Sequence, residues 1–72
     1  MSNVINLPQI PSNVKSVRVM AGLTQQQAAK VSNVDAASII KAEFDIEPMT
    51  SEDWNKYLCA CQSITIKGDN NV

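Results

Sequence analysis

The chain has 72 residues, of which 44% are hydrophobic, and its formal net charge is −1. A chain of this length forms one domain that buries only about 60% of its unfolded surface, so its stability alone is marginal and association into a dimer would increase it. No apolar run approaches the ~20 residues that span a bilayer, and no signal-peptide pattern opens the chain, so we expect a soluble cytoplasmic protein.

The first segment is predicted to be an N-terminal arm over residues 1–11. Pro8 and Pro11 exclude the interior of a helix. A short extended strand through Val4 and Ile5 is the weaker alternative, because these residues alternate only loosely with polar ones.

A first helix is predicted from residue 12 to about residue 21. Ser12 or Asn13 supplies the N-cap, since a side-chain oxygen there accepts a hydrogen bond from an amide of the first turn. The apolar residues of this segment share one face at helical spacing, which is typical of a core-facing helix. They are Val14, Val17 and Met20 or Ala21.

The next two helices are short and joined by a tight turn. Thr24 is a predicted N-cap, and Gln27 three residues later completes a capping box. Asn33 ends this helix, because asparagine tolerates the left-handed conformation, and Asp35 is the N-cap of a second helix over residues 36–43. Two short helices joined in this way cross steeply and form a helix-turn-helix unit, whose second helix can lie in the major groove of DNA.

The residues in and around this unit follow the spacing of a known family. They are Arg18, Gly22-Leu23-Thr24-Gln25, Ala29, Asn33-Val34-Asp35, Ile39 and Glu43. Over roughly residues 13–58 the chain resembles the phage repressor and Cro-type helix-turn-helix domain. It departs from the family at the turn glycine, which is Asn33, at two usual leucines, which are Ala28 and Ser32, and at a later glycine, which is Asp45.

This resemblance implies a mainly all-α fold, a compact four-helix lambda-repressor-like domain over residues 12–62. It also implies that Arg18 on the first helix pairs with Glu43 at the end of the recognition helix, and that Gln25 contacts a DNA phosphate. The implied function is that of a small phage or prophage transcriptional regulator.

A fourth helix is predicted to begin after the loop that ends at Pro48. Thr50 caps it, and Asp53 stands three residues further on. Its apolar residues fall at i, i+3, i+4 and i+7 and close the core: Trp54, Tyr57, Leu58 and Cys61. Trp54 and Tyr57 could instead stack on a base, but their place on this stripe favours the core.

The last segment, residues 63–72, is predicted to be a short β-strand followed by a tail. Ile64 and Ile66 alternate with polar residues in the run from Ser63 to Lys67. A lone strand is unstable, so this one needs a partner. The partner is either the N-terminal arm or the same strand of a second subunit. Some Cro proteins dimerise through such a strand, and we therefore expect a homodimer.

The residue types exclude most catalytic and metal chemistry. The chain has no histidine, which is the commonest general base and metal ligand. Cys59 and Cys61 provide only two of the four ligands of a structural zinc site, and they point to different faces of a helix. We expect two reduced thiols, no enzymatic activity, no catalytic residue and no metal or other cofactor.

Charge is unevenly distributed along the chain. Residues 1–42 carry four cationic side chains against Asp35 alone, a net +3, and residues 43–72 carry two against six carboxylates, a net −4. This polarity is compatible with a weakly basic face toward DNA and an acidic face away from it.

The leading hypothesis is therefore a sequence-specific DNA-binding transcriptional regulator that acts on a double-stranded operator. No membrane association and no small-molecule ligand are indicated. Phosphates would meet the starts of the two short helices, and bases would be read from the start of the second. The predicted DNA-binding residues are Thr24, Gln25, Gln26, Asp35, Ala36, Ala37, Ser38 and Lys41.

The alternative is a protein-interaction module that keeps the helix-turn-helix scaffold without binding DNA. The acidic C-terminal half, the small side chains at residues 36–38 and the exposed Val31 favour it. Fold alone does not decide between these functions.

Overall fold

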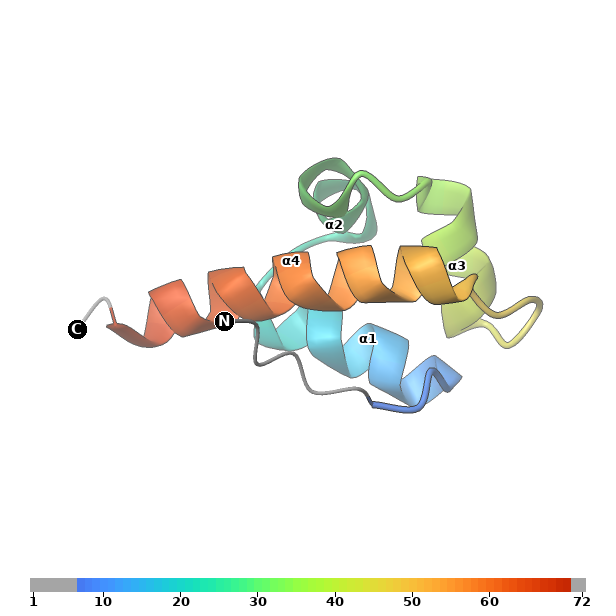
Figure 1. Cartoon of the computed structure of the whole chain (residues 1–72), viewed down its shortest axis with the longest axis horizontal. Helices are drawn as coiled ribbons and strands as arrows, with labels where there is room; N and C mark the ends of the chain where they lie inside the picture. Colours follow the sequence, from blue (N-terminus) through green and yellow to red (C-terminus); the bar gives the residue numbers. More distant parts are fainter. Residues whose placement is uncertain (1–6, 71–72) are drawn as a thin grey trace.

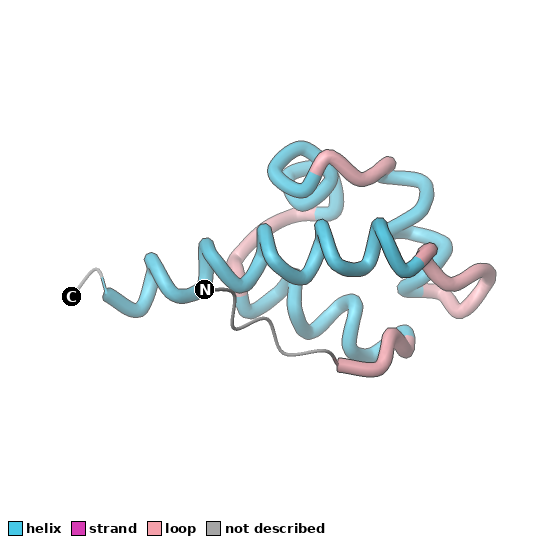
Figure 2. Tube along the Cα trace, in the orientation of Figure 1, coloured by secondary structure: helices cyan, strands magenta, loops and turns pink. Residues whose placement is uncertain are grey.

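The computed structural model describes the backbone of residues 7–70 and the side chains up to residue 65. This part of the chain contains four helices and no strand (Figures 1 and 2), which confirms the mainly all-α class. The helices are α1 (Pro11–Met20), α2 (Gln25–Ser32), α3 (Ala36–Glu43) and α4 (Ser51–Asn70). None of these described helices combines the length and the apolar character needed to cross a membrane.

Helix α1 begins one residue earlier than predicted. Its N-cap position is held by Ile10, which makes no side-chain capping bond, and Pro11 is the first helical residue. The expectation that Ser12 or Asn13 caps this helix is therefore wrong. Proline suits this position because its fixed φ is already helical and the amide hydrogen that it lacks would be unpaired there.

Helices α2 and α3 begin and end close to the predicted residues. Thr24 Oγ1 accepts from the amide of Gln27 at 3.1 Å, and the Gln27 side chain accepts from the amide of Thr24 at 2.9 Å, so the capping box is confirmed. Asn33 is left-handed with φ 60°, as expected. Asp35 holds the N-cap position of α3, but its carboxylate makes no capping hydrogen bond.

The core lies among the four helices: α4 packs against α1 and α2, and α3 packs against the same two helices (Figure 1). The predicted stripe of α4 is buried in full, with Tyr57 and Leu58 at 0% exposure. The Tyr57 hydroxyl donates to the carbonyl of Val14 at 2.6 Å, and Trp54 Nε1 donates to the carbonyl of Leu7 at 2.9 Å. Both aromatic side chains therefore serve the core, not base stacking.

The two thiols lie in different surroundings. Cys59 is exposed and Cys61 is buried, and both are free. Burial raises the pKa of the Cys61 thiol to about 11 and also raises the pKa of the Tyr57 hydroxyl. The buried thiol is therefore a neutral packing group at physiological pH.

The predicted strand from Ser63 to Lys67 is wrong, because α4 continues through this segment to Asn70. A helix that already has several turns adds each further residue at the cost of ordering that residue alone, and gains a hydrogen bond for it. Thr65 also fits the helix, since its hydroxyl donates to the carbonyl of Cys61 at 3.0 Å. The alternative strand through Val4 and Ile5 lies outside the described residues.

Candidate nucleic-acid interface

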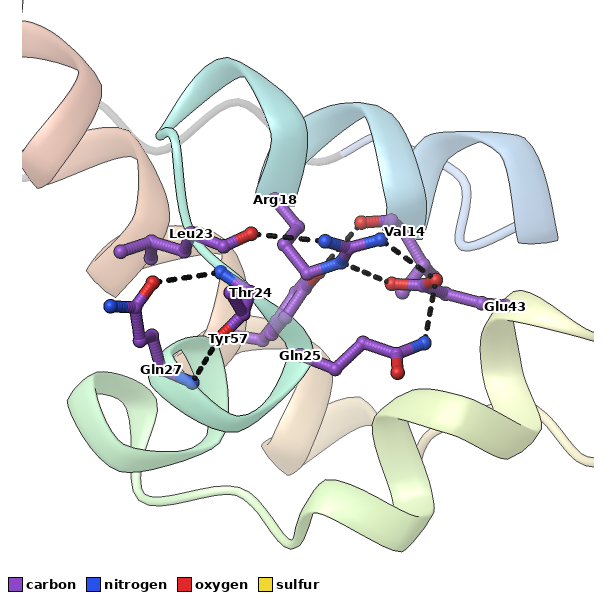
Figure 3. Close-up of polar contacts among 8 residues, drawn as sticks. All are labelled: Val14, Arg18, Leu23, Thr24, Gln25, Gln27, Glu43 and Tyr57. Atoms are coloured by element: carbon purple, nitrogen blue, oxygen red, sulfur yellow. Dashed lines mark hydrogen bonds and ion pairs between the residues drawn. The ribbon is translucent and has the colours of Figure 1, made fainter.

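Helix α3 is fixed to α1 by a largely buried ion pair. Arg18 Nε donates to Glu43 Oε2 at 2.7 Å and Arg18 Nη2 donates to Glu43 Oε1 at 3.2 Å (Figure 3). The two side chains are only 14% and 6% exposed. The predicted pairing of Arg18 with Glu43 is thus confirmed, and the glutamate raises the pKa of the arginine further.

Two further contacts turn this pair into a junction of three elements. Arg18 Nη1 donates to the carbonyl of Leu23, just before α2, at 2.9 Å. Gln25 Nε2 donates to Glu43 Oε1 at 3.1 Å, so the first residue of α2 is held against the last residue of α3 (Figure 3). We refer to Arg18, Leu23, Gln25 and Glu43 as the α1–α3 junction.

Sequence reasoning missed the bond from Gln25 to Glu43. It assigned Gln25 to a phosphate, and no local spacing relates residues 25 and 43. The only clue to this bond in the sequence was chemical. A carboxylate can accept more hydrogen bonds than one arginine supplies, so Glu43 had room for a second donor. The amide nitrogen of Gln25 has two hydrogens, so one N–H is still free to meet a phosphate.

The starts of α2 and α3 present free backbone donors. The amides of Gln25, Gln26, Ala36 and Ala37 have no hydrogen-bond partner among the described residues. The Thr24 hydroxyl, in contrast, is occupied by the capping box. Helix N-termini with unpaired amides attract anions, both by hydrogen bonding and through the helix dipole.

The outward face of α3 is more apolar than predicted. Ile39 and Ala42 face the core, while four residues at helical spacing are exposed: Ala37, Ile40, Lys41 and Phe44. Of the predicted base readers, Ala37 and Lys41 lie on this face, and Ala36 and Ser38 are half-buried. Sequence reasoning missed Ile40 and Phe44, although the spacing 37, 40, 41, 44 marks one face of a helix.

The predicted DNA-binding residues do not converge on one pocket. Gln26, Asp35 and Ala36 line an open depression between α2 and α3. Ser38 and Lys41 line a smaller one with residues 47–50. There Lys41 Nζ lies 3.8 Å from Glu47 Oε1, and both side chains are more than half exposed. The predicted residues are therefore divided between two separate depressions.

A comparison with known protein families, with curated proteins and with solved structures finds no match to this chain. The likeness to the repressor and Cro-type domain therefore rests on the residues quoted above.

Proposed function

We propose that the protein is a sequence-specific DNA-binding transcriptional regulator of the small repressor type, which inserts α3 into the major groove. The observation that carries this proposal is the α1–α3 junction. It fixes α3 against α1 and α2 and leaves residues 37, 40, 41 and 44 exposed. A groove-reading helix requires such support, since base contacts depend on its orientation.

Electrostatics support modest affinity for one subunit. Lys41 faces outward with the free amides of α2 and α3, and the charge of Glu43 is neutralised by Arg18. The exposed carboxylates flank α3, with Asp35 directly before it and Asp45 and Glu47 shortly after it, and they oppose phosphates. Two subunits bound to adjacent half-sites would together bind DNA more tightly than one. Once the first subunit is bound, the second is held at a high effective concentration beside its half-site.

The direct test is gel retardation on genomic fragments at low and moderate salt. DNA binding of this kind predicts retention that falls steeply as salt rises, since each neutralised phosphate releases a counterion. Absence of retention at low salt would refute the proposal. In this proposal the protein works in the cytoplasm on DNA, and its two thiols remain reduced.

Lys41→Ala and Gln25→Ala should weaken DNA binding in different ways. We expect Lys41→Ala to lower affinity for a preferred site by about tenfold or more and to relax sequence choice, because Lys41 faces the bases. Gln25→Ala should weaken binding to preferred and random DNA alike, because its contact is a phosphate. Binding titrations on both DNAs measure the difference.

Equal losses for Lys41→Ala on preferred and random DNA would remove that residue from the reading face. Because Gln25 also supports Glu43, its variant must first be shown by circular dichroism to fold at the assay temperature.

We further propose a homodimer, although not one joined by the strand predicted over residues 63–67. The intact chain should sediment as a dimer at tens of micromolar. A chain that ends at Gln62 should stay folded, because the described core residues of α4 end at Cys61. Analytical ultracentrifugation of both chains decides whether residues 63–72 carry the contact. A monomeric intact chain would refute the dimer in free solution.

A second candidate function is that of a protein-interaction module. It is favoured by the exposed apolar side chains at the end of α3 and after it, namely Ile40 at 38% exposure and Phe44 and Ile46 at 69% each. Large exposed apolar residues that lie close together are typical of protein-binding surfaces. The retardation experiment separates the two, since this module would show no salt-dependent retention.

A further inference from the structure

We propose that the exposed stripe Ala37, Ile40 and Phe44 reads thymine methyl groups, so that the preferred half-site is rich in A·T pairs whose thymine edges face α3. This inference rests on the DNA binding proposed above and names the kind of sequence that the surface would select.

The geometry of the stripe suits the major groove. Its residues stand at i, i+3 and i+7, so they form one row along α3. Seven residues of helix rise about 10 Å, close to the length of three base-pair steps. Helix α3 is supported from behind by buried Ile39 and Ala42, and its last residue is held by the α1–α3 junction.

The hydrogen-bond donors beside the stripe favour nucleic acid as the occupant. The free amides of Ala36 and Ala37 lie at one end of α3, and Lys41 lies next to Ile40 on the same face. The free amides that begin α2 lie near the other end, because Gln25 is bonded to Glu43. An apolar row with N–H donors beside it complements methyl groups bordered by phosphates. The exposed carboxylates Asp35, Asp45 and Glu47 oppose phosphates, and Lys41 Nζ lies 3.8 Å from Glu47 Oε1, so the free amides supply most of the attraction.

The chemistry of the side chains explains why thymine is selected. Alanine, isoleucine and phenylalanine cannot hydrogen-bond to a base edge, so they gain only by covering apolar groups. The C5-methyl of thymine is the one apolar group among the base edges of the major groove. A G·C pair offers no such methyl group, so an apolar side chain gains less by covering its edge.

The test replaces thymine by uracil, which removes the methyl group and preserves every hydrogen-bonding group. A preferred site is first enriched from random double-stranded DNA with the intact protein. Binding is then measured on that site with each thymine replaced by deoxyuridine, singly and together. We expect a loss of roughly three- to fivefold for each contacted methyl, from the transfer energy of one methyl group. When all contacted thymines are replaced together, the fold-losses in affinity measured at the single positions should multiply.

Two variants link this loss to the stripe. Ile40→Ser should bind thymine and uracil sites with nearly equal affinity. Val19→Ser changes an exposed aliphatic residue on α1, which is 55% exposed, and should keep the full difference between the two sites. Ile40→Ala serves the same purpose if Ile40→Ser does not fold. The comparison of thymine and uracil sites with the wild-type protein does not depend on either variant.

The possible outcomes are distinct. An enriched site on which uracil binds as well as thymine would overturn the inference while DNA binding stands. Uracil without effect, together with dissociation of a dimer by Ile40→Ser, would assign the stripe to a contact between two copies and also overturn it. No enriched site and no salt-dependent retention would overturn the proposed function, and the thymine readout with it.

Discussion

Glu43→Ala should lower the free energy of unfolding by about 3 kcal/mol, the low end of the cost of removing one partner from a buried ion pair, because this pair is partly exposed. The carboxylate is 6% exposed and accepts from both Arg18 and Gln25, so its loss leaves a buried guanidinium without its counter-charge. A chain of 72 residues has about 4–11 kcal/mol of total stability, so this variant loses a large part of it. Urea denaturation followed by circular dichroism measures the change.

Glu47→Ala is the matched control. It removes a carboxylate that is 69% exposed and lies 3.8 Å from a half-exposed lysine, so the expected change is within about 0.5 kcal/mol. The double variant Arg18→Met with Glu43→Leu should be more stable than either charge deletion alone, since it leaves no buried charge unpaired. If Glu43→Ala unfolds at the same urea concentration as wild type and Glu47→Ala, the junction does not stabilise the fold.

Helix ends could largely be predicted from the sequence where their signals are local. The Thr24 and Gln27 capping box, the left-handed Asn33 and the Thr50 cap each depend on residues within four positions of one another. In each case the sequence itself contains both the donor and the acceptor, or the residue that tolerates the required φ. The stripe on α4 was also predictable, because helical spacing decides which side chains share a face.

The structure explains two residues that depart from the pattern of the family that the sequence resembles. Asp45 stands where glycine is expected and adopts φ 60°, while the amides of Asp45 and Ile46 donate to the carbonyls of Ala42 and Lys41 in a Schellman-type ending of α3. Ser32 is buried where leucine is usual. Its hydroxyl donates to the carbonyl of Ala28 at 2.6 Å, so it leaves no unsatisfied group.

The errors arose where competing structures have similar local signals. Alternating Ile64 and Ile66 fit a strand, but they also extend an existing helix, and no local rule weighs a missing strand partner against helix growth. The candidate site was incomplete for a different reason. Ile40 was passed over because base readers were sought among small and polar residues. The helical spacing groups residues 37, 40, 41 and 44 on one face, but the packing of α3 is needed to show that this face is the exposed one.

Tyr57→Ala should destabilise the domain by about 3–5 kcal/mol, as large aromatic truncations in cores do. Tyr57 has 0% exposure and is the largest fully buried side chain. Its ring packs against Trp54 with 6.0 Å between centroids, and its hydroxyl joins α4 to α1 through the carbonyl of Val14. The truncation removes packing and this hydrogen bond together, so thermal and urea unfolding should both show a much earlier transition.

Tyr57→Phe separates these two contributions. It keeps the ring and removes only the hydroxyl, so it should cost about 1–2 kcal/mol, the range expected when a buried acceptor loses its donor. Trp54→Phe offers a comparison on the same stripe, since it also keeps an aromatic ring but loses the bond from Nε1 to the carbonyl of Leu7. If Tyr57→Phe were as destabilising as Tyr57→Ala, the hydrogen bond to α1 would dominate. If Tyr57→Ala unfolded like wild type, the position of Tyr57 at the centre of the core would be wrong, and the way α4 supports α1 and the junction behind α3 would have to be different.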